Sequence, residues 1–194
     1  MGSWEPIGSI ALLQVQTGEM TERGGYDLDM LVDVDSLLLT PVGVFGRSAG
    51  AWIVDRHHRH HPPARRWYAE DVLSLGFTSH YEHLWELFRP TALGSTGENV
   101  IVTCDAIVTA PEVAGGLRIE SERGHVALSE AQAMEPCVEF TRVVTSRPDT
   151  SPYDVAADRE RLRHGVRGFA VGFAGPDPAE ISVGDVVTIR AALP

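Results

Sequence analysis

The feature that most constrains how this chain folds is the frequency of glycine and proline between short apolar stretches. The 194 residues include 19 glycines and 12 prolines. Several of the stretches between them alternate apolar and polar side chains, and this period of two is typical of half-buried strands. Short strands joined by frequent turns, with few helices, indicate a mainly-β fold: a β-barrel with a few peripheral helices.

The predicted strands are spread over the whole chain. They cover 7–16, 28–40 (one or two strands), 51–54, 99–108, 117–120, 126–129, 138–144, 168–173 and 186–190. Between them, 41–50 contains one proline and three glycines, so we expect tight turns there. Hydrophobic residues make up 43% of the chain, which is enough for a packed interior. No repeat or linker divides the sequence, and we therefore expect one domain over 1–194.

Two helices are expected. The first covers 79–88, and four of its residues are expected to form the side that faces the core: Tyr81, Leu84, Trp85 and Phe88. On the same helix, His80 and His83 are expected on the exposed surface. The second helix covers 155–164, and its charged residues are expected to face solvent.

The basic residues are all arginines, because the sequence contains no lysine among its 16 basic positions. A pyridoxal-phosphate enzyme needs a lysine for its Schiff base, and a P-loop needs one in its signature, so this chain alone provides neither site. The formal net charge of −11 at pH 7 opposes binding to nucleic acid and to anionic lipid. No apolar stretch approaches the length of a membrane span. We expect neither a nucleic acid nor a membrane as a partner.

The two cysteines are too few for a disulfide framework. Residues 1–16 have no basic segment and only a short apolar run, so we expect no signal peptide, a cytoplasmic location and free thiols. Cys104 lies in an apolar stretch and is expected in the core. Cys137 follows Pro136, which interrupts strand pairing and favours an exposed side chain at a strand edge. A soft sulfur ligand suits molybdenum, copper(I) or sulfane sulfur, whereas the alternative is a small packed hydrophobe.

The segment 55–66 is rich in histidine and arginine, and the sequence leaves three interpretations open. Neutral imidazoles bind zinc, so His57 with His60 or His61 could hold one ion, with Asp55 nearby. A solvated loop is the plainest interpretation. The third is an anion cradle, because arginine forks bind phosphate in a bidentate manner. The arginine candidates for anion binding are Arg56, Arg59, Arg65 and Arg66 in this segment, and Arg142 and Arg167 farther along.

Five short motifs follow one another in a characteristic order. They are Gly94-Ser-Thr-Gly-Glu-Asn-Val100, Gly116-Leu-Arg-Ile119, Glu135-Pro-Cys-Val-Glu-Phe-Thr141, Arg163-His-Gly-Val-Arg-Gly-Phe-Ala170 and Ile181-Ser-Val-Gly-Asp-Val-Val187. In this order the sequence resembles the MOSC family, named for the C-terminal domain of molybdenum-cofactor sulfurases, most clearly over 44–190. One motif departs from the family pattern Gly-x-x-Gly-Asp-x-His, because Gly43-Val-Phe-Gly-Arg47 lacks the aspartate and Asp55-Arg-His57 comes later.

The resemblance implies a MOSC-type β-barrel in which Cys137 is the catalytic residue and binds the metal or the sulfur, and Asn99 lies near the site. It implies the molybdenum cofactor, with its phosphate held by the segment 55–66, including His57. Relatives of this kind reduce N-hydroxylated compounds or transfer sulfur. The chain has no flavin or dinucleotide motif and too few cysteines for an iron–sulfur cluster, so a reductase would need a separate electron-transfer protein. A sulfur carrier would need a separate sulfur donor.

The alternative is a non-enzymatic β-barrel module that binds a small anionic ligand or a protein partner. In this alternative Cys137 is merely packed, and the missing aspartate near Arg47 favours it. The two hypotheses differ in chemistry, because a functional cysteine reacts with thiol reagents in the folded protein and a packed one does not.

Overall fold

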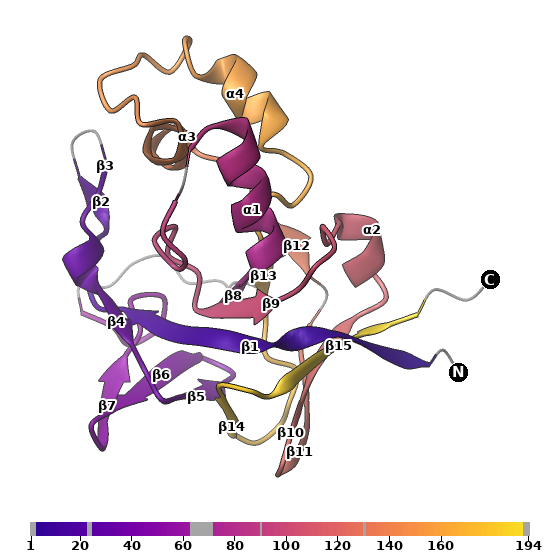
Figure 1. Ribbon diagram of the computed structural model, residues 1–194. Helices are drawn as coiled ribbons and strands as arrows, with labels where there is room; N and C mark the ends of the chain where they lie inside the picture. Colours follow the sequence, from indigo (N-terminus) through magenta and orange to yellow (C-terminus); the bar gives the residue numbers. More distant parts are fainter. Residues whose placement is uncertain (1–2, 23–24, 63–71, 90, 130, 192–194) are drawn as a thin grey trace.

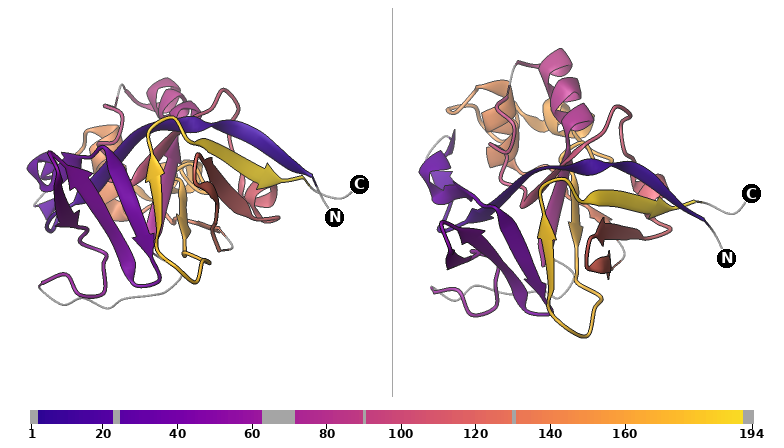
Figure 2. Two further views of the ribbon diagram at one scale, coloured as in Figure 1. Left: turned by 90° about the horizontal axis from the view of Figure 1, so that it is seen from below. Right: turned by 60° about the horizontal axis from the view of Figure 1, so that its bottom comes forward.

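The computed structural model describes residues 3–22, 25–62, 72–89, 91–129 and 131–191. Within these residues the chain is mainly β: a curled sheet forms part of a barrel, and the helices lie at its periphery (Figures 1 and 2). This arrangement confirms the predicted fold class. The helices in the described ranges include none with the length and apolar character of a membrane span.

Nine of the described strands form the large sheet. They are β1 (Trp4–Gln16), β4 (Leu31–Asp33), β8 (Leu73–Phe77), β9 (Val100–Thr103), β10 (Leu117–Ser121), β11 (Gly124–Ala127), β12 (Gln132–Ala133), β13 (Phe169–Val171) and β15 (Val186–Arg190). Their order is β11–β10–β15–β1–β9–β8–β13–β12, and β4 pairs with the C-terminal end of β1.

A smaller sheet lies beside the large one. Its described strands are β14 (Ala179–Ser182), β5 (Ser36–Thr40), β6 (Gly43–Ser48) and β7 (Ala51–Val54), in that order. A short hairpin, β2 (Thr21–Glu22) with β3 (Gly25–Tyr26), follows β1. The described helices are η1 (Leu28–Met30), α1 (Thr78–Leu87), α2 (Ala110–Val113), α3 (Val138–Thr145) and α4 (Ala156–Arg161).

The long strand β1 holds the large sheet together. It is thirteen residues long and pairs first with β15, then with β9 and finally with β4. Its register shifts between Pro6 and Gly8, and again between Ile10 and Leu12. Such bulges bend a strand and increase its twist, which allows β1 to curve along the sheet (Figure 1). At the first bulge only glycine fits, because a Cβ atom on Gly8 would lie 1.7 Å from the carbonyl oxygen of Thr103.

The parallel pair β8 and β9 positions residues of the candidate functional site. Parallel neighbours need a crossover connection, and α1 with the segment that follows it provides one. Helix α1 confirms the prediction over 79–88 to within one residue at each end, whereas strand β8 was not predicted. The crossover returns to the sheet through Thr96–Asn99, so these polar residues arrive at the beginning of β9.

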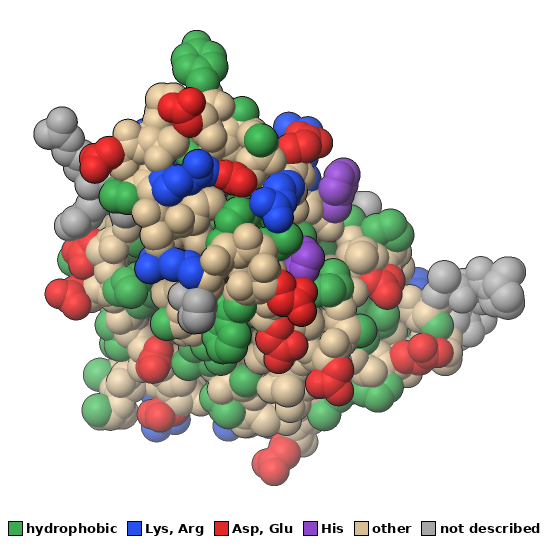
Figure 3. Space-filling model, turned by 45° about the horizontal axis from the view of Figure 1, so that its top comes forward, with side chains coloured by type: hydrophobic (Ala, Val, Ile, Leu, Met, Phe, Trp, Pro, Cys, Tyr) green, Lys and Arg blue, Asp and Glu red, His purple; other side chains and the backbone are tan. Residues whose placement is uncertain are grey.

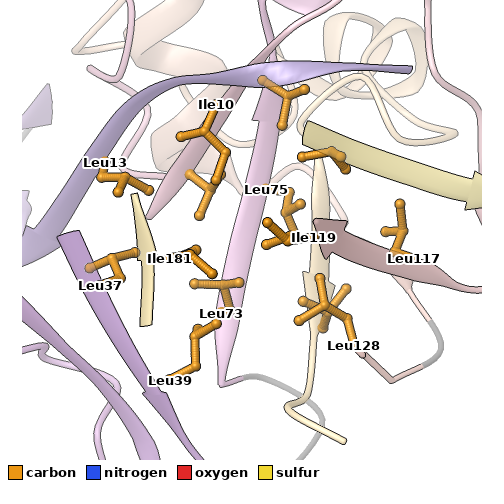
Figure 4. Close-up of a cluster of buried hydrophobic side chains, with 14 of the residues drawn as sticks. Ile10, Leu13, Leu37, Leu39, Leu73, Leu75, Leu117, Ile119, Leu128 and Ile181 are labelled. Carbon is orange, nitrogen blue, oxygen red and sulfur yellow. The ribbon is translucent and has the colours of Figure 1, made fainter. Parts of the chain in front are cut away.

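The core lies between the two sheets, where apolar side chains from both point towards one another (Figure 4). Ile10 and Leu13 of β1 meet Leu37 and Leu39 of β5, and Leu75 of β8 lies in the middle of the cluster. The alternation of buried and exposed positions explains why β10 was predictable, since Leu117 and Ile119 are buried while their neighbours are not. Cys104 also packs in this core, at 8% exposure, as predicted.

The prediction of a strand over 138–144 is wrong, because these residues form the helix α3. Its β-branched residues favour a strand, but Phe140, Thr141 and Val144 are buried at the spacing of one helix face. Cys137 caps the helix, and its Sγ accepts a hydrogen bond from the backbone N–H of Phe140 at 3.3 Å. Cys137 therefore lies at the N-terminus of a helix and not at a strand edge.

Three further predictions need correction. The segment 41–50 contains strand β6 and not only turns. On α1, the side that faces the core includes His80, which is 2% exposed, whereas Trp85 is 48% exposed. His80 is accommodated because its Nε2 lies 3.0 Å from the carbonyl oxygen of Val108, and burial lowers its pKa to about 4. The described residues contain four α-helices where two were expected.

Leu75→Ala is expected to lower the free energy of unfolding by about 2–5 kcal/mol, because it leaves a cavity where the side chain is completely buried. Urea denaturation measures this change. The control is Val183→Ala in the turn before β15, where the side chain is 52% exposed and a change within about 0.5 kcal/mol is expected. Equal effects of the two substitutions would contradict the assignment of Leu75 to the core.

Candidate functional site

A cavity of about 350 Å³, termed the main cavity below, opens where one end of β1 meets the beginnings of β8 and β9. This volume falls within the range of roughly 300–1,000 Å³ that is typical of small-molecule sites. The residues that line it are Gln16, Glu19, Met20, Thr21, Tyr26, His57, Leu73, Ser74, Thr96, Gly97, Glu98, Asn99, Met134, Arg167 and Ala170. Many are polar, although they come from segments far apart in the sequence.

Asp55 lies behind the lining of the main cavity, and its side chain is 0% exposed. Its Oδ2 accepts hydrogen bonds from the backbone N–H of Gln16 at 2.8 Å and from Nδ2 of Asn99 at 2.9 Å. Its Oδ1 accepts from the backbone N–H of His57 at 2.7 Å and lies 3.0 Å from His57 Nδ1. Burial by itself raises the pKa of Asp55, but the hydrogen bonds from His57 and Gln16 outweigh it and hold the pKa below the ordinary value of 3.8.

The contact with Asp55 orients the His57 ring. Because a carboxylate accepts and does not donate, Nδ1 of His57 carries the hydrogen, and Nε2 is left as the proton acceptor or metal ligand. The side chain is 31% exposed and lines the main cavity. His57 can therefore exchange a proton with a bound molecule or coordinate a metal.

Asn99 ties the beginning of β8 to Asp55. Its Oδ1 accepts from the backbone N–H and the hydroxyl of Ser74, at 3.2 and 3.0 Å, while its Nδ2 donates to Asp55. The side chain is buried and lines the main cavity. The structure thus brings Asn99 and His57, two of the residues selected from the sequence, to one cavity and joins them through Asp55.

Glu98 places a buried carboxyl group in the same wall. Its side chain is 3% exposed and accepts hydrogen bonds from the hydroxyls of Tyr81 at 2.7 Å and Thr96 at 2.6 Å. Burial raises the pKa of Glu98 above its ordinary value of 4.5, and the hydrogen bonds from Thr96 and Tyr81 offset only part of this effect. Protonation of the Glu98 carboxyl is therefore easier in this wall than in water.

Arg167 brings a positive charge to the main cavity. Its Nη1 donates to the carbonyl oxygen of Glu135 at 2.8 Å, and its guanidinium lies over the Phe140 ring at 5.2 Å. Tyr26 lines the cavity as well, and burial raises its pKa, so its hydroxyl stays protonated and can donate. A cation and the Tyr26 hydroxyl in one cavity favour an anionic ligand.

Cys137 lies next to the main cavity and not in its lining. Its side chain is half-buried, and Sγ lies 4.0 Å from the hydroxyl of Tyr26, which lines the cavity. Sγ also accepts the hydrogen bond from Phe140, at a helix end where the free backbone N–H groups favour negative charge. The side chain also packs against a small apolar cluster that includes Phe140 and Val144.

The other arginines selected from the sequence lie elsewhere. Arg56 is 8% exposed and forms an ion pair with Glu19 at 3.2 Å, and Glu19 lines the main cavity. Arg59 is exposed. Arg142 lines a different cavity and donates twice to the carbonyl oxygen of Thr150. Arg65 and Arg66 lie outside the described residues.

The histidines that follow Asp55 make backbone contacts. Nδ1 of His58 accepts from the backbone N–H of His60 at 3.1 Å, and Nε2 of His61 lies 3.2 Å from the carbonyl oxygen of Thr17. Within the described ranges, no three histidine, cysteine, aspartate or glutamate side chains come together as a metal-binding group. The zinc interpretation of this segment thus has no support from the described residues.

Comparison with known proteins gives a result from structure alone. No family model and no curated protein matches the sequence. The YuaD protein from Bacillus subtilis has a similar crystal structure, with a TM-score of 0.61 and 16% identity over 98% of this chain and 100% of that one. YiiM from Escherichia coli gives a TM-score of 0.53, again with 16% identity, over 95% of this chain and 71% of that one.

YiiM from Geobacillus stearothermophilus gives a TM-score of 0.50 with 16% identity, over 96% of this chain and 75% of that one. YuaD and YiiM are MOSC-domain proteins. This chain has a MOSC-like fold. At 16% identity the likeness concerns the fold and not the activity or the ligand.

Sequence reasoning did not select Tyr26, Glu98 or Asp55 as binding residues. Glu98 belongs to the Gly-x-x-Gly-Glu-Asn motif, and its position beside Asn99 was the available signal. Asp55 was noticed as part of a displaced motif and as a carboxylate near the possible zinc ligands, whereas its buried carboxylate accounts for the orientation of His57. Tyr26 gave no signal, because it meets Cys137 across 111 positions of sequence.

Glu98→Gln is expected to remove a pH dependence of stability. The raised pKa of Glu98 contributes stability that is fully present below pH 4.5 and is lost as the pH rises through the folded-state value. Glutamine keeps the shape but does not titrate, so the variant should gain stability relative to the wild type between pH 4.5 and pH 8. Urea denaturation at both pH values measures the difference. Parallel pH profiles for the two proteins would refute the raised pKa.

Asp55→Asn is expected to lower the free energy of unfolding by about 3 kcal/mol at pH 7, because an amide NH₂ would face donors that now find an oxygen. The lowered pKa of Asp55 contributes stability that is present above pH 3.8 and is lost as the pH falls through the folded-state value. The wild type should therefore approach the variant in stability under acid conditions. Asp35→Asn, at an exposed position, is the control and should change stability by less than about 0.5 kcal/mol.

Proposed function

We propose that this chain is a stand-alone MOSC-like protein that binds a molybdenum cofactor or carries sulfur through Cys137. The observation that carries the proposal is the contact of the Cys137 thiol with Tyr26, whose ring lines a cavity that also holds Arg167. Sulfur is the soft ligand that molybdenum and sulfane sulfur require. Arg167 and the Tyr26 hydroxyl suit the anionic part of such a ligand.

The donor set fits the molybdenum cofactor. Cys137 would hold the metal, Arg167 would bind the phosphate, and the polar side chains of Asn99 and Glu98 would meet the pterin. The bound metal would supply a two-electron redox centre. His57, held by Asp55, would then take up or deliver protons at its Nε2. A reductase role, with N-hydroxylated compounds as the substrate class, needs electrons from a separate protein.

The sulfur-carrier form of the proposal uses the same cysteine. The Cys137 sulfur would attack the outer sulfur of a donor persulfide, so that a new sulfur–sulfur bond forms on Cys137 and the donor leaves as a thiolate. The step needs no added oxidant, because the sulfane sulfur moves with its oxidation state unchanged. The donor must be a separate protein, since this chain has no lysine for a pyridoxal-phosphate desulfurase.

A second candidate function is a binding module without chemistry at the thiol. It is favoured by the packing of Cys137 against Phe140 and Val144 and by its place outside the lining of the main cavity. In this candidate the main cavity binds a small anion, and Cys137 serves as the helix cap.

The test is elemental analysis of the protein purified from a host that makes molybdenum cofactor. Cys137→Ser is the informative variant, because serine keeps the cap of α3 while it removes the soft ligand. Cys104→Ala is the control, since Cys104 is in the core. We expect near-stoichiometric molybdenum in the wild type and the control, and none in Cys137→Ser.

For the sulfur-carrier form, the wild type is incubated with a polysulfide donor, and the added sulfur is located by peptide mass spectrometry. We expect it on Cys137. If the folded wild type holds no molybdenum, acquires no sulfur on Cys137 and does not react there with a thiol reagent, the proposal fails and the binding module remains.

A further inference from the structure

A second cavity, of about 470 Å³, shares Tyr26 with the main cavity. We term it the arginine cavity. Its walls come from Tyr26 and Leu28, from Arg89, Thr91, Ala92 and Ser95 after α1, and from the C-terminal part of α3 with the turn that follows. No role has been given to it so far, and neither Cys137 nor His57 lines it.

The charge of this cavity contrasts with that of the protein. Its lining includes Arg89 and Arg142 and, among the described residues, no aspartate or glutamate, although the chain has a net charge of −11. Arg142 is fixed by donating from Nε and Nη2 to the carbonyl oxygen of Thr150, at 2.9 and 2.6 Å, and so has no carboxylate partner there. Arg89 is exposed and makes no ion pair with any described residue. Two guanidinium groups without acidic partners favour an anion.

Figure 3 shows a face on which several arginines gather. Blue arginine side chains lie in its upper central part, and red acidic side chains lie between and beside them. The preference for an anion therefore comes from Arg89 and Arg142, which line the cavity, and not from the charge of the surface as a whole.

The remaining walls of the arginine cavity are partly apolar, which favours a ligand with an apolar part. Leu28, Val143 and Pro148 supply apolar surface, and Leu28 is 48% exposed. Ser146 also lines the cavity and has a φ of +55°, in the left-handed region that favours glycine. This φ belongs to the C-cap of α3, where a left-handed residue commonly ends a helix, so Ser146 adds a polar group to the wall without indicating strain.

We propose that the arginine cavity is a binding site for a small amphipathic anion, with its carboxylate or phosphate on Arg89 and Arg142 and its apolar body on Leu28 and Val143. The site stands apart from the chemistry proposed for Cys137 and does not require it. Tyr26, which lines both cavities, gives the ligand one further hydrogen-bond donor.

The test is isothermal titration calorimetry with phenyl phosphate, benzoate and inorganic phosphate as the probes. Phenyl phosphate and benzoate separate the two anion types, and inorganic phosphate shows what the apolar body contributes. We expect at least one of the two aromatic anions to bind more tightly than inorganic phosphate. The Kd of that aromatic anion for Arg89→Gln should be about tenfold or more above its Kd for the wild type, because the variant loses a charge-assisted hydrogen bond.

Arg190→Gln is the matched control, because it removes the same charge at an exposed arginine beside Trp4, away from this cavity. The Kd of the same aromatic anion for Arg190→Gln should differ from the wild-type Kd by less than about twofold. Val143→Glu, which adds a negative charge to the wall and leaves both arginines in place, should abolish binding. Binding that is undetectable in the wild type, or that is equal in wild type and Arg89→Gln, overturns the proposal. Cys137→Ser should bind the probes as the wild type does, so the outcome is independent of the proposed function.

Discussion

The carboxylate of Asp55 is the interaction on which the site depends. It accepts four hydrogen bonds, from the end of β1, from the beginning of the histidine segment and from the residue that precedes β9. Three segments that are distant in sequence thus meet at one buried anion, and His57 obtains its orientation from the same contact. Its lowered pKa and the raised pKa of Glu98 show how two carboxyl groups in one wall are separated by their partners. Both groups are buried, but Asp55 accepts from N–H donors on Gln16, His57 and Asn99, whereas the side chains that donate to Glu98 are the hydroxyls of Thr96 and Tyr81.

Much of the fold could be predicted from the sequence, because alternating patterns and turn residues are local properties. The strand 186–190 and the helix near 79–88 follow from such patterns. Strand β8 was missed because the neighbouring helical pattern dominated the same region. Helix α3 was missed because its residues favour strands locally, while the burial of Phe140 and Val144 decides the outcome. Predictions therefore failed where tertiary packing overrides local preference.

The site was less predictable, because its geometry depends on contacts between remote segments. Asn99 and His57 were selected through the family resemblance, and both line the main cavity. The arginines of the segment 55–66 were selected as a cluster of charge. Neighbouring positions in the sequence do not determine the directions of the side chains, however. Arg167, selected from the sequence only as one of six arginine candidates, lies in the main cavity because its contacts with the Phe140 ring and the Glu135 carbonyl hold it there. The difference in hydrogen-bond partners that separates the pKa values of Asp55 and Glu98 has no sequence signal at all.

The position of β15 in the large sheet sets an order of events during synthesis. This strand lies between β1 and β10, which are both made earlier, and pairs with each of them. Until residues 186–190 have left the ribosome, β1 and β10 therefore expose unpaired backbone groups that can associate with other chains. Pairing of the first described strand with the last one also gives a high contact order, which slows folding. In a nascent chain those two edges stay open to association until residues 186–190 can pair with them.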